Sequence, residues 1–492
     1  MGLYHQFNHI RINMSEEMIK KAESEETKSG ITGLAKRIRF YMGLWSGKLS
    51  VIVMRLMKRH GSVLPGQVAL KICPDFLSMT SYPEKIISVT GTNGKTTVAN
   101  MLIELLTRDG HHVLSNSSGA NTKSGICAMF VNGLSFCGKC RHDICVYEID
   151  EKWTKIIFPI ITPHILAVTN LSCDSISRNA HPAYIRDILN DAIPSSTTLV
   201  LNADNRFTAF LAPDNRRVYF GVDLFPSDSS GHAGILLGEL ICPDCGHYLV
   251  WDKLHYSEAG RVHCPHCGLQ SPERDYLCKN IDLKNRQFVL SEEDGEVSCS
   301  LPGIVDFNIY NAVTAASVLR VMGYERNRVA ELFHGLKIME NRIRCSHVGN
   351  TTVYTMYSKV KNAYANSRVF EYLRTIKGEK EVVILTKCMN SGKTEPPANI
   401  VWIYDCDYEL LNTPELCNIV LYGPYTHDIK LRLLLAGIPE NRIRIADTMA
   451  DVPEKLYLNE DETIFILYVH DYDEAHRIEH NIIKRIKEKL PT

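Results

Sequence analysis

The segment "IISVTGTNGKTTVANML", residues 86–102, constrains the fold of this 492-residue chain more than any other stretch. An apolar run comes first, then a glycine-rich turn, then the start of a helical stretch. Glycines let backbone N–H groups close around phosphate oxygens, and the N-terminus of the following helix favours negative charge. Lys95 adds a cation for the β- and γ-phosphates, and Thr96 offers a hydroxyl to Mg²⁺. Strand, loop and helix in this order predict an α/β fold with a phosphate site.

The loop is shorter than the common G-x-x-x-x-G-K-[ST] pattern, whose first glycine would fall on Val89. A plain glycine turn between a strand and a helix is the structural alternative, but it leaves the Lys-Thr-Thr sequence unexplained. We therefore expect the phosphates of a nucleotide to bind here. The expected contacts are Gly91, Thr92, Asn93, Gly94, Lys95, Thr96 and Thr97.

An acidic segment follows the apolar run "ICVY" and offers a carboxylate for the metal. Ligands of α/β proteins bind beyond the carboxyl ends of parallel strands, where this segment is expected to lie. We expect Glu148 to hold Mg²⁺ together with Thr96, although a solvated acidic strand end is the alternative. Asn170 and Asp174 end the next apolar run and make a weaker case.

Short apolar runs alternate with helical sequence from residue 85 onward, and this spacing is typical of parallel strands with crossover helices. A second alternation begins after residue 340 and includes "EVVILTK", "NIVWIYD", "NIVLYG", "RIRIAD" and "TIFILYV". We expect an N-terminal tail at 1–35, an ATP-binding domain at 36–339 and a separate α/β domain at 340–492.

A cysteine-rich insert at about 240–275 interrupts the first domain. Two C-x-x-C pairs, each followed by glycine, are separated by eighteen residues and fit a zinc ribbon. The expected ligands are Cys242, Cys245, Cys264 and Cys267. Four thiolates leave no open coordination position, so the Zn²⁺ is expected to be structural. A further pair, Cys137 and Cys140, has no partner pair nearby and is interpreted as a turn with free thiols.

Composition excludes several classes of function. Lys plus Arg total 55 and Asp plus Glu total 56, which gives no indication of a nucleic-acid binder. The first thirty residues are polar where a signal peptide would be apolar, so we expect a cytoplasmic protein with reduced thiols. Residues 37–60 form a basic amphipathic stretch, and Gly43 and Gly47 are expected to divide it into two helical pieces. A helix packed on the core is the simpler interpretation, and peripheral contact with the inner face of a membrane is the alternative.

Several strings resemble the Mur ligases and folylpolyglutamate synthases. They are "GTNGKTT", "NSSGANTKSGI", "YEIDE", "LNADN" and "LPGIVDFNIYNAVTAASV". The zinc ribbon and the upstream "GKLSVIVMRLMKRHGSVLPGQVALKICPDFL" narrow the resemblance to the MurT family, the synthetase subunits of lipid II isoglutaminyl synthase. The resemblance implies a Mur ligase-type central domain followed by a Rossmann-like domain. It further implies that Asn308 and Asn311 contact adenine and that Glu148 binds the metal.

The resemblance also implies a reaction and a partner. ATP would phosphorylate the α-carboxyl of D-glutamate in lipid II, and ammonia from a class I glutaminase of the GatD type would form the amide. An aspartate of the C-terminal domain is thought to complete the catalytic triad of that partner, and Asp405 is the candidate here. The sequence contains no convincing glutaminase nucleophile of its own.

The C-terminal domain departs from the family pattern. The family's K-N-P-A-G is "KNAYANS" here, which keeps Lys361 and Asn362, and Asn399 replaces an aspartate. Asp428, Arg432 and Gly437 are retained. Two alternatives stay open at this point: a Mur-type ligase that joins an amino acid instead of ammonia, and a divergent homologue that binds ATP without catalysis.

Overall fold

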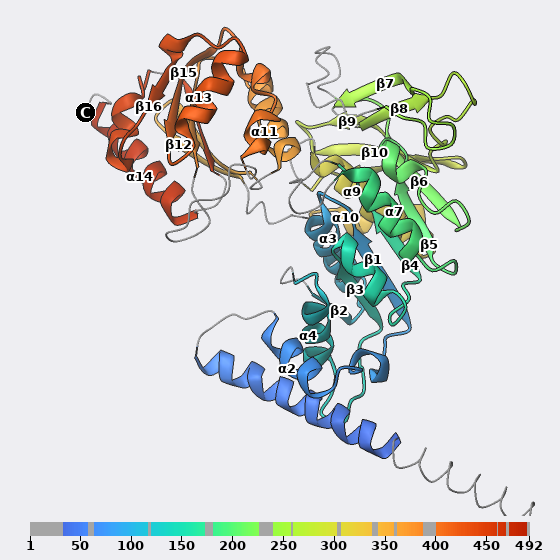
Figure 1. Ribbon diagram of the computed structural model, residues 1–492. Helices are drawn as coiled ribbons and strands as arrows, with labels where there is room; N and C mark the ends of the chain where they lie inside the picture. Colours follow the sequence, from blue (N-terminus) through green and yellow to red (C-terminus); the bar gives the residue numbers. More distant parts are fainter. Residues whose placement is uncertain are drawn as a thin grey trace, which may run out of the picture. The chain divides into compact units, whose positions relative to one another are not determined.

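The computed structural model describes residues 33–57, 63–116, 120–172, 181–225, 240–256, 259–302, 307–336, 343–358, 362–386, 400–459, 461–468 and 472–489 (Figure 1). The chain forms two compact units. The first contains Met1–Ile86, His111–Glu148 and Ile156–Thr162, and the second contains Ile87–Gly110, Ile149–Lys155 and Pro163–Thr492. The chain therefore passes repeatedly from one unit to the other.

Helices dominate the first unit. A helix over residues 33–56 packs on α2 (Leu64–Ile72) and α4 (Lys123–Gly133), and η1 (Leu77–Met79) follows α2. A Cβ atom at Gly47 would lie 2.9 Å from Cγ1 of Val131, and one at Gly43 would lie 3.1 Å from the Ala69 carbonyl oxygen. The expectation that these glycines divide the helix is wrong, because they instead allow close packing. The parallel strands β2 (Val113–Ser115) and β3 (Ile144–Glu148) complete this unit.

The second unit contains a sheet in which β1, β4, β5, β6 and β9 run parallel, and β10 and β11 extend it as an antiparallel meander. The parallel strands β1 and β4 are almost wholly buried, as expected for strands covered on both faces. The strands are β1 (Lys85–Thr90), β4 (Ile165–Val168), β5 (Thr198–Asn202), β6 (Arg217–Val222), β9 (Tyr276–Asp282), β10 (Gln287–Glu292) and β11 (Gly295–Ser300).

Helices between these strands supply the rest of the core. Helix α3 packs on α9, and α9 contacts β4, β5, β6 and β9. The helices are α3 (Lys95–Arg108), α5 (Thr154–Ile157), α7 (Pro182–Ala192), α8 (Arg206–Ala209), α9 (Phe307–Val321) and α10 (Arg326–Phe333), with η2 (Glu151–Trp153) before α5. A separate hairpin, β7 (Val250–Tyr256) and β8 (Ala259–His263), belongs to the cysteine insert.

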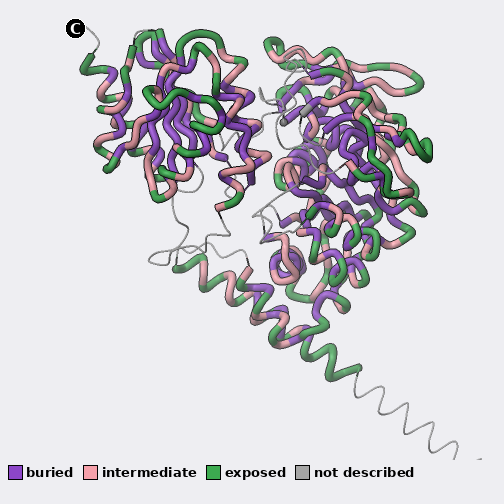
Figure 2. Tube along the Cα trace, turned by 45° about the horizontal axis from the view of Figure 1, so that its top comes forward, coloured by how far each residue is buried: buried purple, intermediate pink, exposed green. Residues whose placement is uncertain are grey.

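A six-stranded sheet forms the C-terminal part, in the order β12-β13-β17-β14-β15-β16. All pairs are parallel except the hairpin β12–β13. Helices α11, α12 and α13 share one apolar core with the sheet and α14 shares the other, so helices cover both faces (Figures 1 and 2). The strands are β12 (Ile343–Val348), β13 (Thr351–Tyr357), β14 (Lys380–Leu385), β15 (Leu416–Tyr422), β16 (Ile443–Ile445) and β17 (Thr463–Tyr468). The helices are α11 (Ala363–Thr375), α12 (Val401–Tyr404), α13 (Thr426–Leu435) and α14 (Tyr472–Lys489), with 3-10 turns η5 (Tyr408–Leu411), η6 (Glu440–Arg442), η7 (Met449–Asp451) and η8 (Pro453–Lys455).

Candidate functional site

The glycine-rich loop joins β1 to α3 in a conformation that depends on its glycines. Gly91 has φ 124° and Gly94 has φ 86°, values that residues with a side chain rarely adopt. A Cβ atom would lie 2.4 Å from Oγ1 of Thr169 at the first position and 2.2 Å from Oδ1 of Asn311 at the second. The loop therefore has no room for side chains at these points, and its backbone remains available for a ligand.

Asn170, at the end of β4, holds the loop in place. Its side-chain carbonyl accepts a hydrogen bond from the Asn93 backbone N–H at 3.1 Å, and its amide donates to the Asn93 carbonyl oxygen at 3.0 Å. Its own carbonyl oxygen accepts from the N–H of Thr92 at 2.7 Å. The weaker candidate of the sequence analysis is thus a positioning residue of the loop, while Asp174 lies outside the described residues.

Lys95 begins α3 and turns back onto the loop. Its Nζ donates to the Gly91 carbonyl oxygen and lies 3.0 Å from Oε1 of Glu151. Glu151 is almost completely buried, and its Oε2 has no hydrogen-bond partner among the described residues. The ammonium group is therefore held at the loop by a buried carboxylate. Thr96 follows in the first turn and is exposed.

Glu148 is the last residue of β3 and is also buried. Its backbone N–H and carbonyl oxygen exchange hydrogen bonds with the side-chain amide of Asn116, at 2.9 and 2.8 Å. Its Oε2 has no hydrogen-bond partner in the part of the chain that the structure describes. A buried carboxylate oxygen without a partner is costly unless a cation or donor is added, so this residue is chemically suited to a metal ligand.

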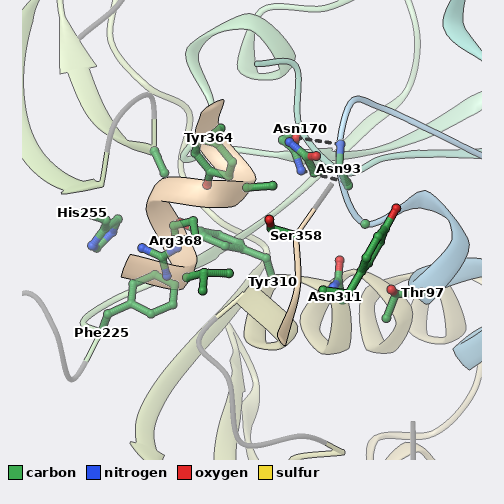
Figure 3. A pocket seen from close by; sticks show the side chains of 15 residues that line it. Asn93, Thr97, Asn170, Phe225, His255, Tyr310, Asn311, Ser358, Tyr364 and Arg368 are labelled. Atoms are coloured by element: carbon green, nitrogen blue, oxygen red, sulfur yellow. Dashed lines mark hydrogen bonds between the residues drawn. The ribbon is translucent and has the colours of Figure 1, made fainter. Parts of the chain in front are cut away.

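A pocket opens beside the loop. Asn93, Thr97 and Asn311 line one end, and Phe225, His255 and Arg368 line the other (Figure 3). The further lining residues are Gly94, Asn170, Ala259, Tyr310, Tyr357, Ser358, Tyr364, Ala365 and Val369.

The two asparagines that the family resemblance assigns to adenine both lie in the first two turns of α9. Asn311 lines the pocket and donates a weak hydrogen bond of 3.5 Å to Oδ1 of Asn308. Both are buried. Next to them, the Tyr310 hydroxyl donates to Asp204 at 3.1 Å, and burial raises the pKa of this tyrosine well above its usual value. Tyr310 therefore stays neutral and forms part of the pocket wall.

The C-terminal segment contributes Asn362, which the family pattern retains, and Arg368, which sequence reasoning missed. Asn362 caps α11 by accepting from the N–H of Ala365 at 2.7 Å and donates to Oδ1 of Asn93 at 3.0 Å. Arg368 brings a guanidinium to the pocket, where it lies 6.0 Å from the centre of the Phe225 ring and pairs with Glu371 at 2.5 Å. Nothing in the local spacing around Arg368 distinguishes it from a surface arginine. Lys361 lies outside the described residues, as does Asn399.

Asp405 directly follows α12 and is half-buried. Burial raises the pKa of its carboxyl group, and the positive charge of Arg432 partly opposes this shift. Arg432 fixes the segment by donating to the carbonyl oxygens of Tyr404 and Cys406, both at 3.0 Å. Asp428 accepts a hydrogen bond of 2.9 Å from the Tyr404 hydroxyl. Among the retained family residues, Arg432 and Asp428 thus position the segment that carries Asp405.

The cysteine insert folds as two similar turns that bring its thiols together. In each turn a glycine with φ of 73° or 78° donates its N–H to the carbonyl oxygen of the first cysteine at 3.0 Å. The four Sγ atoms lie within 4.8 Å of one another, and two pairs are 3.5 Å apart. A tetrahedral Zn²⁺ with Zn–S bonds of about 2.3 Å requires sulfur atoms about 3.8 Å apart. Cys242, Cys245, Cys264 and Cys267 therefore fit the metal.

The nearby histidines lie outside this four-sulfur group. His247 and His266 stack at 3.6 Å, and His263 contacts Asp252 at 2.6 Å. The hydrophobic cluster of the insert contains only four buried residues, of which two are the cysteines Cys242 and Cys264. Such a small core provides little stability by itself, so the metal is expected to hold the insert together. The other pair, Cys137 and Cys140, lies in a turn as free thiols.

Comparison with known proteins agrees with this geometry. Residues 359–471 match the family described as MurT ligase C-terminal. The lipid II isoglutaminyl synthase (glutamine-hydrolyzing) subunit MurT of Streptococcus pneumoniae is 28% identical over 84% of this chain and 90% of its own length.

Solved structures share the fold at lower identity. A pseudomurein peptide ligase type C from Methanothermus fervidus superposes with a TM-score of 0.61 at 18% identity, over 84% of this chain and 81% of its own. The MurF ligase of Thermotoga maritima, solved in complex with ADP, gives a TM-score of 0.57 at 14% identity, over 87% and 85% of the two chains. The chain therefore has the Mur ligase fold, carries a C-terminal segment that matches the MurT ligase C-terminal family, and is similar to MurT subunits over most of its length.

Proposed function

We propose that this protein is the ATP-dependent synthetase subunit of a glutamine-dependent amidotransferase that acts on lipid II. The coarser function, an ATP-dependent ligase for a peptidoglycan precursor, follows from the MurT relative and the Mur ligase fold. The finer assignment is the amidation of the D-glutamate α-carboxyl group. The observation that carries the proposal is the glycine loop with Lys95 at the start of α3, opening onto a pocket that the C-terminal segment also lines.

The reaction has two steps. A carboxylate oxygen of the substrate attacks the γ-phosphorus of ATP, the bond to the β–γ bridging oxygen breaks, and ADP leaves behind an acyl phosphate. Ammonia then attacks the acyl carbon, inorganic phosphate leaves with the former carboxylate oxygen, and the nitrogen loses one proton as the amide forms. A class I glutaminase of the GatD type would supply the ammonia by hydrolysing glutamine.

The residues of the loop suit the first step. Lys95 offers its ammonium group to phosphate oxygens, and charge stabilisation of this kind is the main contribution of proteins to phosphoryl transfer. Glu151 holds Lys95 in place, and Asn170 fixes the loop backbone. Asn308 and Asn311 are proposed to contact the adenine.

Magnesium would be held by Glu148 and Thr96. When bound, Mg²⁺ would neutralise charge on the β- and γ-phosphates. The free carboxylate oxygen of Glu148 supports this assignment, because it is buried and has no hydrogen-bond partner within the described residues. The ADP complex of the MurF neighbour supports a nucleotide at this fold.

The C-terminal segment is proposed to serve the acceptor and the partner. Arg368 offers a guanidinium suited to the acceptor carboxylate at the end of the pocket away from the loop (Figure 3). Asp405 remains the candidate for the partner's triad. Its half-buried carboxyl group lies on a segment that Arg432 holds in place.

The test is ADP release from the purified protein supplied with lipid II, ATP and Mg²⁺, with the nitrogen source varied. Glutamine with the glutaminase partner should support turnover, and high ammonium should replace both. Lys95→Ala should lower kcat by roughly 10²- to 10³-fold, the usual effect of removing one such stabilising group. Lys85→Ala, an exposed lysine on β1, is the matched control and should turn over normally.

Three results would contradict the proposal. Incorporation of a free amino acid in place of ammonia would identify an amino-acid ligase. ATP binding without ADP release from any nitrogen source would indicate a non-catalytic homologue. Normal turnover of Lys95→Ala would remove the lysine from the mechanism.

A further inference from the structure

The helix over residues 33–56 carries an exposed apolar stripe. Its members follow one another at alternating intervals of four and three residues, and between 48 and 79% of each is exposed. They are Ile38, Met42, Trp45, Leu49, Ile52 and Leu56. At about 100° per residue this spacing puts them all on one face of the helix.

This stripe is not the face that packs on the protein. Phe40 and Leu44 are buried, and Gly43 and Gly47 make the close contacts to α2 and α4 described above. These four positions lie roughly opposite the stripe around the helix axis. Figure 2 shows exposed residues along this helix, next to the buried ones. Internal packing therefore accounts for one face of the helix and leaves the apolar stripe unexplained.

The basic residues of this helix indicate what kind of surface the stripe contacts. Residues 33–57 contain five basic side chains, Lys36, Arg37, Arg39, Lys48 and Arg55, and no Asp or Glu, although the whole chain has a net charge of −1. Around the helix axis Lys48 and Arg55 fall beside one edge of the stripe. A second copy of this helix would bring like charges together, whereas a negatively charged surface would be attracted.

An exposed aromatic residue, Phe136, lies next to Trp45 of the stripe. Trp45 donates its indole N–H to the carbonyl oxygen of Phe136 at 3.0 Å, and 64% of Phe136 is exposed. Nζ of Lys48 lies 5.2 Å from the centre of the Phe136 ring. Aromatic rings with polar edges prefer the boundary between water and lipid acyl chains, and lysines reach from there toward headgroups.

We propose that the helix 33–56 lies in the surface of an anionic lipid bilayer, with the apolar stripe against the acyl chains and the basic residues among the headgroups. An apolar face with basic edges is the arrangement of helices that bind in the membrane plane. No helix in the described ranges is long and apolar enough to cross a membrane. The inference rests on this helix and the adjacent Phe136 and is independent of the reaction proposed above.

Vesicle co-sedimentation of the full chain tests the proposal. The protein should bind vesicles of phosphatidylglycerol and phosphatidylcholine at least tenfold more tightly than vesicles of phosphatidylcholine alone, and added salt should weaken the binding. Leu49→Glu should reduce binding at least tenfold. Leu435→Glu, which changes an equally exposed leucine on α13, is the matched control and should bind as the unchanged protein does.

Two further measurements keep the test decisive. Brominated lipids should quench tryptophan fluorescence, and Trp45→Phe should lose most of that quenching while it still binds. Leu49→Glu should keep its thermal midpoint, because the side chain is exposed. Equal binding of both leucine variants, or no binding to anionic vesicles, would overturn the proposal. Lipid-independent self-association that Leu49→Glu abolishes would assign the stripe to a second copy and overturn it as well.

Discussion

Gly94→Ala should weaken ATP binding in addition to lowering the stability of the fold. The φ of 86° at this position costs a residue with a side chain roughly 1–2 kcal/mol. In addition, the new methyl group would lie 2.2 Å from Oδ1 of Asn311, so that the buried asparagine has to move. With Asn311 contacting the adenine as proposed above, loss of that buried hydrogen bond would cost roughly 1–3 kcal/mol. At about 1.4 kcal/mol per factor of ten, the affinity for ATP should fall by about 5- to 150-fold from this displacement alone.

Gly110→Ala is the matched control, because Gly110 follows the other end of α3 with a φ of 91° and has nothing within 4 Å of its missing Cβ. Each variant should lose roughly 1–2 kcal/mol of stability, and each kcal/mol corresponds to about 2–4 °C. The thermal midpoint of both should therefore fall by about 2–8 °C. Calorimetric titration should show weakened ATP binding for Gly94→Ala only. The reasoning would be refuted by unchanged ATP affinity of Gly94→Ala, or by an equal loss in Gly110→Ala.

Two other predictions concern the metal and a buried carboxyl pair. Cys242→Ser should abolish stoichiometric zinc, measured by elemental analysis, and lower the thermal midpoint, whereas Cys137→Ser should change neither; a metal-free wild-type protein of normal stability would contradict the structural role. Burial and the adjacent Glu381 carboxylate raise the pKa of Glu462 from 4.5 to about 9. The contribution of Glu462 to the stability of the folded protein is therefore fully present below pH 4.5 and is lost as the pH rises to about 9. Glu462→Gln should flatten the decline of the thermal midpoint across this range, and an unchanged decline would exclude Glu462 as its cause.

Sites built from adjacent residues were predictable from the sequence. The predicted phosphate loop needs two glycines, a lysine and a helix start, all within a few positions, and the structure forms the strand, loop and helix as expected. The four-cysteine cluster is likewise encoded by two short C-x-x-C turns, each closed by a glycine with positive φ. In both cases local backbone geometry restricts the residue types, so the pattern is visible without the fold.

Contacts between distant segments could not be predicted in this way. Arg368 lines the pocket and Asn362 donates a hydrogen bond to Asn93. Both contacts form only because α11, more than 250 residues after the loop in the sequence, folds back onto it. The apolar run "NIVWIYD" lies among strand-like segments but forms the short helix α12, because a brief apolar run fits either structure. Gly43 and Gly47 suggested a broken helix, yet their small size serves a helix contact that depends on α2 and α4.

The discontinuity of the first unit has a consequence for biosynthesis. This unit is completed only by Ile156–Thr162, although it begins with the N-terminal residues. Because a ribosome adds roughly 5–20 residues per second, the segment 33–56 emerges several seconds before its unit can close. During that time its apolar side chains have no completed fold to pack on. A chaperone, or early contact of the nascent chain with lipid, would therefore protect this segment from aggregation.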